Sequence, residues 1–183
     1  GGPTVITAPY LINELFELKT TSSLALIFKI STAARTSEVI GAQWNEFDLT
    51  NKIWTIPASR MKKRREHVVP LNDLACMIIN NMPKHNSSEF IFLNNSKKSH
   101  IDNNKMNVTL KTYLPEFHKK TVPHGFRSSF RNWAEENYNF SRRVVELCLS
   151  HTNKNKVENA YLRSNLFGKR QQIMSEWNKF LQK

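Results

Sequence analysis

Apolar residues recur at helical spacing along most of the chain. Residues 9–18, PYLINELFEL, carry such a stripe, and residues 23–30, SLALIFKI, are apolar on nearly every side, which predicts a buried helix. The same spacing predicts further helices at residues 72–82, 124–138, 142–151, 156–164 and 169–182. The pattern therefore indicates a mainly helical chain.

A short β region interrupts these helices. Strand-like segments occupy residues 44–47, 52–57 and 66–70, and the last two flank a basic stretch, ASRMKKRRE, which we expect at the tip of a hairpin. Residues 84–104 are predicted to be polar loops in which EFIFLN is the one ordered stretch. We therefore expect an α+β fold, mainly α-helical, with a small three-stranded antiparallel sheet.

Composition limits the classes of function. The chain has 183 residues, enough for about one domain, and 27 Lys and Arg against 15 Asp and Glu give a net charge of +12. This charge favours a polyanionic partner such as nucleic acid or an acidic membrane surface. No apolar run approaches the roughly 20 residues of a membrane span, so we expect no membrane-spanning segment and no membrane partner. Cys76 and Cys148 lie far apart, which indicates a reducing, cytoplasmic location without disulfides.

Several residues could carry chemistry, although each signal is weak alone. The hydroxyls of Thr36 and Ser37 can cap a short helix beginning near Glu38, which leaves Arg35 in a joint between helices, where arginines usually bind carbonyls or carboxylates. His124 and Arg127 lie one helical turn apart on a face that could simply be solvated. Residues 62–65 form a basic run of the kind that often only contacts solvent or phosphate.

The order of these signals is more specific than any one of them. ARTSEV, a lysine on a basic hairpin, HGFR, LSH and AYLR follow one another in a single chain. This succession resembles the catalytic domain of the tyrosine recombinases, in particular the integrases of phages and genomic islands, over roughly residues 8–181. The resemblance implies a six-residue active site, which consists of Arg35, Lys62, His124, Arg127, His151 and Tyr161. Glu38 matches the acidic residue that supports the first arginine.

Two features of the match concern its register. The family's lysine stands eight residues before the proline that closes the next strand, which selects Lys62 over Lys63 because that proline is Pro70. The interval from His151 to Tyr161 is ten residues, where many recombinases have nine; the longer interval fits the island-integrase branch.

The resemblance also implies a mechanism in which each residue type has a physical role. Tyr161 would attack a DNA phosphodiester, while Arg35 and Arg127 would clamp the oxygens on which negative charge builds. Lys62 would protonate the leaving 5′-oxygen as general acid. The histidines would assist proton transfer and donate a hydrogen bond to phosphate. The 3′-phosphotyrosine would preserve the bond energy, so rejoining would need no ATP, and the resemblance implies neither a metal nor another cofactor.

The same resemblance implies a domain organisation and partners. Residues 1–7 are expected to be a cloning remnant or linker and residues 8–183 the catalytic domain, with N-terminal DNA-binding domains absent from this chain. The expected partner is double-stranded DNA at attachment sites. The full-length protein would work as a homotetramer, the isolated fragment would be a monomer, and a directionality factor could assist. A nucleoid-associated location in a bacterial or phage-infected cell is implied.

Other functions fit parts of the pattern. A type IB topoisomerase uses similar chemistry, and a catalytically silent DNA-binding module would keep the charge. A metal-dependent nuclease needs clustered carboxylates, whereas the three aspartates, Asp48, Asp73 and Asp102, are scattered. A zinc site could be drawn from four residues that lack the usual paired spacing, namely His118, His124, Cys148 and His151.

The C-terminal segment has two possible partners. Residues 169–182 carry Ile173, Met174, Trp177 and either Phe180 or Leu181 on one face. This apolar stripe could pack on its own domain. Alternatively, by resemblance, it could dock on a neighbouring protomer with Trp177 as its anchor.

Overall fold

The computed structural model describes residues 8–120, 125–137, 140–150 and 156–183, and for residues 120, 137 and 156–165 it describes only the helical backbone. The described helices are α1 (Ala8–Leu18), α2 (Thr21–Thr32), α3 (Thr36–Ile40), α4 (Asp73–Asn81), α5 (Lys105–Tyr113), α6 (Pro115–Lys120), α7 (Gly125–Asn137), α8 (Arg142–Cys148) and α9 (Lys156–Leu181). The expected linker at residues 1–7 lies outside the described residues.

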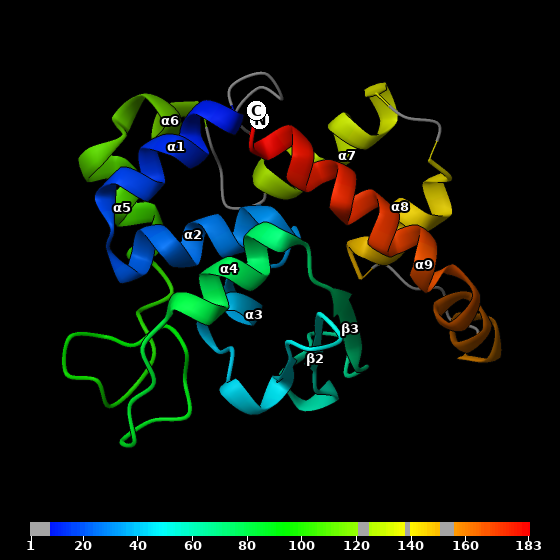
Figure 1. Ribbon diagram of the computed structural model, residues 1–183, viewed down its shortest axis with the longest axis horizontal. Coiled ribbons are helices and arrows are strands. Elements are labelled where there is room, and N and C mark those ends of the chain that lie inside the picture. The colour runs from blue at the N-terminus through cyan, green and yellow to red at the C-terminus, as the bar shows by residue number, and fades with distance from the viewer. Residues whose placement is uncertain (1–7, 121–124, 138–139, 151–155) are drawn as a thin grey trace.

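The buried helix predicted from SLALIFKI is α2, and it lies at the centre of the molecule (Figure 1). It contacts α1, α3, α4, α5 and α9. A capping box starts it, in which Thr20 Oγ1 accepts from the Ser23 amide and Ser23 Oγ accepts from the Thr20 amide. Ala33 ends it in the left-handed conformation, with φ at 57°. The all-round apolar sequence of α2 is thus explained by neighbours on every side.

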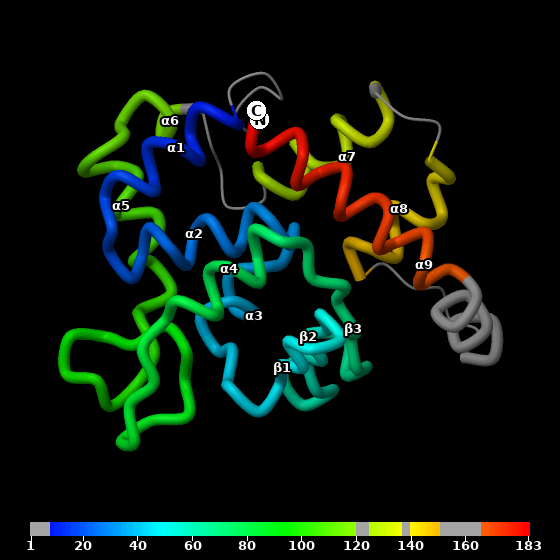
Figure 2. Tube along the Cα trace, in the orientation of Figure 1, coloured from blue at the N-terminus to red at the C-terminus, as the bar shows by residue number. Residues whose placement is uncertain are grey.

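The three-stranded antiparallel sheet is confirmed. Its strands are β1 (Phe47–Asp48), β2 (Ile53–Ile56) and β3 (His67–Pro70), in the order β1-β2-β3, with Trp54 opposite Phe47 on one side and Val69 on the other. In the Cα trace of Figure 2 the strands lie together below α4, and β3 also contacts α9. The predicted first strand was too long, because Trp44–Glu46 forms a 3₁₀ turn, η2, before Phe47.

The loop region at residues 84–104 is also largely as expected. Its ordered stretch contributes isolated bridges, Gln43 to Phe90 and Leu93 to His100, and buries Phe92 against Phe28 of α2. The helices α5 and α6 were not predicted, because their sequences are mostly polar and only a few side chains, such as Met106 and Leu110, are buried.

The C-terminal prediction of two separate helices is wrong. Residues 156–181 form one continuous helix, α9, through Gly168. A glycine in a helix interior costs only about 1 kcal/mol, which the helix-forming residues on both sides offset. The apolar stripe of α9 packs on its own domain. Trp177 is buried against Trp133 of α7, at 5.0 Å between ring centroids, and its Nε1 donates to the Ile30 carbonyl at 2.8 Å.

Candidate active site

Arg35 is fixed where α2 passes into α3. The helix α3 begins at Thr36, earlier than expected, and Arg35 takes the N-cap position in extended conformation. One Glu38 oxygen accepts the Arg35 amide at 3.0 Å, and the other accepts Nη1 of the same arginine at 3.1 Å. Glu38 is buried. A single carboxylate therefore holds both the backbone and the guanidinium of Arg35.

Arg127 reaches the same joint from α7. Its Nη1 donates to the Ala33 carbonyl and its Nη2 to the Leu149 carbonyl, each at 2.6 Å. Burial, together with the nearby charge of Arg35, lowers the pKa of Arg127 to about 10. An anion bound beside this guanidinium would favour its charged form.

The turn after α8 joins the two arginines. Leu149 supplies the carbonyl that accepts from Arg127, and Ser150 Oγ accepts from Arg35 Nη1 at 2.7 Å. Ser150 is left-handed, with φ at 60°, so the backbone has left the helical conformation of α8 at this residue. Arg35 and Arg127, distant in sequence, are therefore anchored on two consecutive residues.

A third cation, Lys29 of α2, lies in the same region. The side chain is only 4% exposed, its Nζ donates to Thr36 Oγ1 at 2.8 Å, and it lies 5.9 Å from the centroid of the Phe126 ring. Burial, together with the charge of Arg127, lowers the pKa of Lys29 to about 8. The motif analysis missed Lys29. Its signal was a lone lysine in the otherwise apolar segment SLALIFKI.

The hairpin that carries Lys62 is tied to the arginine joint. After β2, a 3₁₀ turn, η3 (Ala58–Arg60), places Arg60 so that its Nε donates to Glu46 Oε2 at 2.7 Å. Arg60 Nη2 also donates to the Glu38 carbonyl at 3.2 Å. Trp54 Nε1 donates to the same Glu46 carboxylate at 3.0 Å. These contacts fix the base of the hairpin beside α3.

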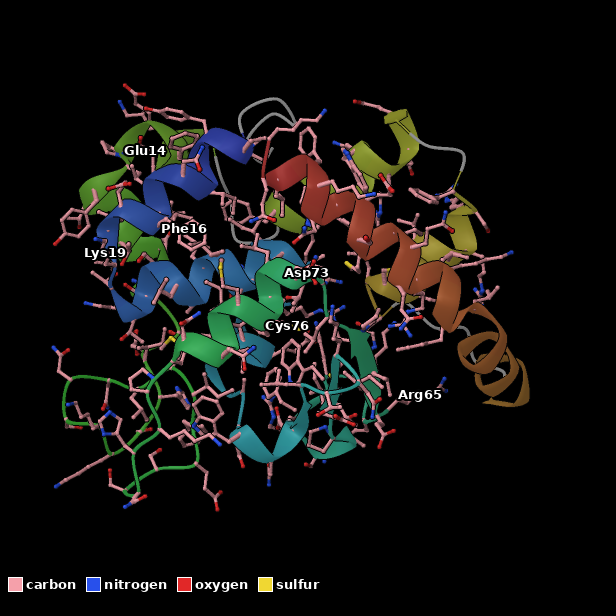
Figure 3. The ribbon with its side chains drawn as sticks, viewed as in Figure 1. Glu14, Phe16, Lys19, Arg65, Asp73 and Cys76 are labelled. Atoms are coloured by element: carbon pink, nitrogen blue, oxygen red, sulfur yellow. The ribbon has the colours of Figure 1, made fainter. Side chains whose placement is uncertain are left out.

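Beyond that base the hairpin is basic and open. Lys62, Lys63 and Arg64 are exposed, and the labelled side chain of Arg65 extends from the hairpin next to β3 (Figure 3). A depression of about 40 Å³ lies between this hairpin and the arginine joint, and it is lined by Arg35, Met61, Lys62, Lys63, Arg65, Glu66, His67 and Ser150.

The structure brings together the described members of the predicted site. Arg35 and Lys62 line one depression, and Arg127 meets Arg35 at the turn after α8. His124 and His151 lie outside the described residues. Tyr161 falls within α9, but its side chain is not described. In the part of the chain that the structure describes, no three His, Cys, Asp or Glu residues gather as a metal site would require.

Two residues of the alternative zinc site, His124 and His151, lie outside the described residues. Of its other members, Cys148 is fully buried, and burial raises the pKa of its thiol to about 11. No described helix is both long enough and apolar enough to cross a membrane.

Known proteins match this chain in sequence and in fold. The model of the phage integrase family matches residues 8–166. The prophage integrase IntA of Escherichia coli K12 is 33% identical over 177 residues, which cover 92% of this chain and 42% of that protein. The integrase of Shigella phage Sf6 is 32% identical over 153 residues, covering 82% of this chain and 39% of that protein.

The structural comparison agrees on the fold. The crystal structure of XerA recombinase superposes with a TM-score of 0.69 and 15% identity, over 90% of this chain and 64% of that one. The chain thus spans about two fifths of the length of the integrases it matches.

Proposed function

Because the chain belongs to the phage integrase family, we propose that it is the catalytic domain of a site-specific DNA recombinase. This enzyme cuts and rejoins DNA strands through a covalent 3′-phosphotyrosine, and so integrates or excises a mobile element. The observation that carries the proposal is the anchoring of Arg35 and Arg127 on consecutive residues, Leu149 and Ser150, beside the depression that Lys62 lines.

The paired arginines suit the charge of the transition state. Attack on a phosphodiester places negative charge on the non-bridging oxygens, and planar guanidinium groups bind such oxygens with parallel N–H donors. Arg35 and Arg127 are held in advance by Glu38, Ser150 and two backbone carbonyls. Little reorganisation is then needed when the phosphate arrives, and this preorganisation lowers the barrier.

The remaining roles follow from the family motif. Tyr161 is the nucleophile, and the cationic surroundings favour its phenolate, which a free tyrosine with a pKa near 10 rarely forms. Lys62, exposed on the hairpin, protonates the leaving 5′-oxygen. His124 assists proton transfer at the phosphate, and His151 donates a hydrogen bond to it. Because the phosphotyrosine keeps the energy of the broken bond, a 5′-hydroxyl reseals the strand without ATP.

The proposal extends to the full-length protein. Residues 8–183 form the catalytic domain, and N-terminal DNA-binding domains clamp the attachment site from the other side of the duplex. The protein then acts in the cytoplasm, at the nucleoid, as a homotetramer on two DNA sites, and a directionality factor biases integration or excision.

Trapping of a covalent adduct tests this function. The substrate is a duplex from the end of the mobile element that encodes the chain, nicked just beyond the scissile phosphate so that the short fragment leaves. We expect an adduct that survives denaturation and chelator. Tyr161→Phe should abolish it without loss of folding, whereas Tyr113→Phe, which changes an exposed tyrosine of α5, should not. An adduct formed by the Tyr161→Phe variant at the wild-type rate would disprove the assignment. A chelator-sensitive reaction would indicate a metal enzyme instead.

A further inference from the structure

Arg170 of α9 is a buried arginine outside the family motif, and it is only 2% exposed. Its Nη2 donates to the carbonyl of Val68 in β3. The same guanidinium acts on the thiol of Cys148, the last residue of α8, by lowering its pKa against the effect of burial, and it lies 5.7 Å from the ring centroid of Phe167. One side chain thus contacts β3, α8 and its own helix.

Each of these contacts leads directly to the proposed active site. Val68 belongs to the strand that returns from the hairpin of Lys62. Cys148 immediately precedes Leu149 and Ser150, which anchor Arg127 and Arg35. On α9 itself, Tyr161 lies nine residues before Arg170, about two and a half helical turns.

The other described polar anchors of α9 are farther from Tyr161. Asn72 donates to the Met174 carbonyl, Trp177 donates to the Ile30 carbonyl, and Asn178 Oδ1 accepts from the Leu74 amide. These contacts attach the C-terminal half of the helix to α2 and to the start of α4. Arg170 differs because it attaches α9 to the hairpin strand and to the end of α8.

We infer that Arg170 is a positioning residue for strand cleavage, which holds the helix of Tyr161 in register with the hairpin of Lys62 and with the turn that anchors both arginines. The inference rests on the proposed function. A guanidinium suits this role because its N–H groups point in fixed, diverging directions and can serve acceptors on two elements at once, whereas a lysine ammonium is a compact point charge. Burial raises the pKa of the Cys148 thiol to about 11, so Arg170 faces a neutral thiol at this position rather than a thiolate.

Rates of adduct formation on two substrates test the inference. One is the nicked duplex with its normal 5′-bridging oxygen, and the other carries sulfur at that position, which leaves without a proton. Lys62→Ala is the reference, because sulfur should restore its rate fully. We expect Arg170→Met to form adduct at least tenfold more slowly on oxygen. Sulfur should restore only part of that loss, because the position of Tyr161 is also disturbed.

Two further variants separate positioning from stability. Asn178→Ala removes an anchor at the far end of α9 and should lower the melting temperature while leaving both rates, and their ratio, at wild-type values. Arg170→Lys keeps the charge but not the fork, so it should resemble Arg170→Met in the rate ratio. If Arg170→Met does not fold, the oxygen-to-sulfur rate ratio of Arg170→Lys provides the test. Wild-type oxygen-to-sulfur ratios in both Arg170 variants would overturn the inference.

Hydrogen exchange tests whether Arg170 couples α9 to the hairpin strand β3, and this measurement does not depend on catalysis. Amides of residues 156–169 and of residues 66–69 should exchange faster together in Arg170→Met, and neither segment should change in Asn178→Ala. If the wild-type chain forms no adduct, the proposed function fails, while joint acceleration would still support the link through Arg170. Unchanged exchange in the hairpin strand would contradict that link.

Discussion

At the joint between α2 and α3, three cationic side chains lie in one region, and one of them pairs with a buried carboxylate. Lys29 belongs to α2, Arg35 is the N-cap of α3, and Arg127 belongs to α7. Glu38 pairs with Arg35. The pKa values of Lys29 and Arg127 are lowered to about 8 and about 10, mainly by burial. Burial therefore disfavours the charged form of both side chains.

The lowered pKa of Lys29 predicts a stability effect with a definite sign. The unfolded lysine stays protonated up to its ordinary value of 10.5, whereas the folded one stays protonated only up to about 8. Between these values the unfolded chain binds more protons, so the free energy of unfolding rises with pH. Lys29→Met removes this titration. The variant should be more stable than wild type near pH 7, by about 1–3 kcal/mol, and its advantage should shrink as the pH rises from 8 toward 10.

Urea unfolding at several pH values measures this difference. Lys52→Met is the matched control, because Lys52 is exposed and its pair with Asp73 raises its pKa rather than lowering it. The difference in free energy of unfolding between Lys52→Met and wild type should stay constant over the same pH range. A constant difference for Lys29→Met as well would mean that Lys29 does not titrate in the folded protein.

At this scale, motifs predicted the residues that we propose to meet phosphate, but not the residues that hold them in place. Arg35, Glu38 and Arg127 were predicted because the motifs that carry them follow one another along the chain in the order of the family's motifs. Arg170 lies outside every motif, since its partners come from strands and helices far away in sequence. Contacts of this kind follow from tertiary packing, which periodicity does not encode.

Among the elements, α9 departs most from expectation. The pattern divided it at Gly168, yet one helix runs from Lys156 to Leu181. A Cβ at Gly168 would meet nothing within 4 Å, so no close contact requires a glycine there. The periodicity identified the buried stripe correctly, but it could not say which surface covers that stripe, because an apolar face fits its own core or a partner equally well.

The position of Trp177 gives α9 a testable structural role. Its ring lies within 5.7 Å of the ring centroids of Trp133, Phe130 and Phe180, and it is 1% exposed. Trp177→Ala should therefore destabilise the isolated chain by about 3–5 kcal/mol. Lys179→Ala, on the exposed side of the same helix, should change stability by less than about 0.5 kcal/mol. Thermal and urea unfolding measure both. A Trp177→Ala variant as stable as wild type, but defective in assembly on DNA, would instead support docking on a neighbouring protomer.

Across the whole molecule, helical periodicity and turn signals predicted the fold class, the sheet and the order of the main elements. These features could be predicted because they depend on turn signals between neighbouring residues or on a continuous apolar stripe along one helix. The polar helices α5 and α6 escaped prediction because tertiary contacts, rather than a strong apolar face, stabilise them. The basic surface is a property of the whole molecule as well, since the net charge of +12 includes the exposed hairpin residues Lys62, Lys63 and Arg64.

This charge predicts a steep dependence of DNA binding on salt. Each phosphate that the protein neutralises releases counterions, and a protein with six or more such contacts loses on the order of 10³ in affinity between about 50 and 200 mM salt. We expect weak binding by this chain with little sequence preference. Lys63→Ala should reduce the slope of log affinity against log salt by about 1. Lys98→Ala removes the same charge from the loop at residues 84–104, well away from the hairpin (Figure 1), and should leave the slope unchanged. Fluorescence anisotropy over a salt series provides the measurement. Tight, salt-insensitive binding to one sequence would show that base contacts, rather than phosphate contacts from the hairpin, dominate recognition.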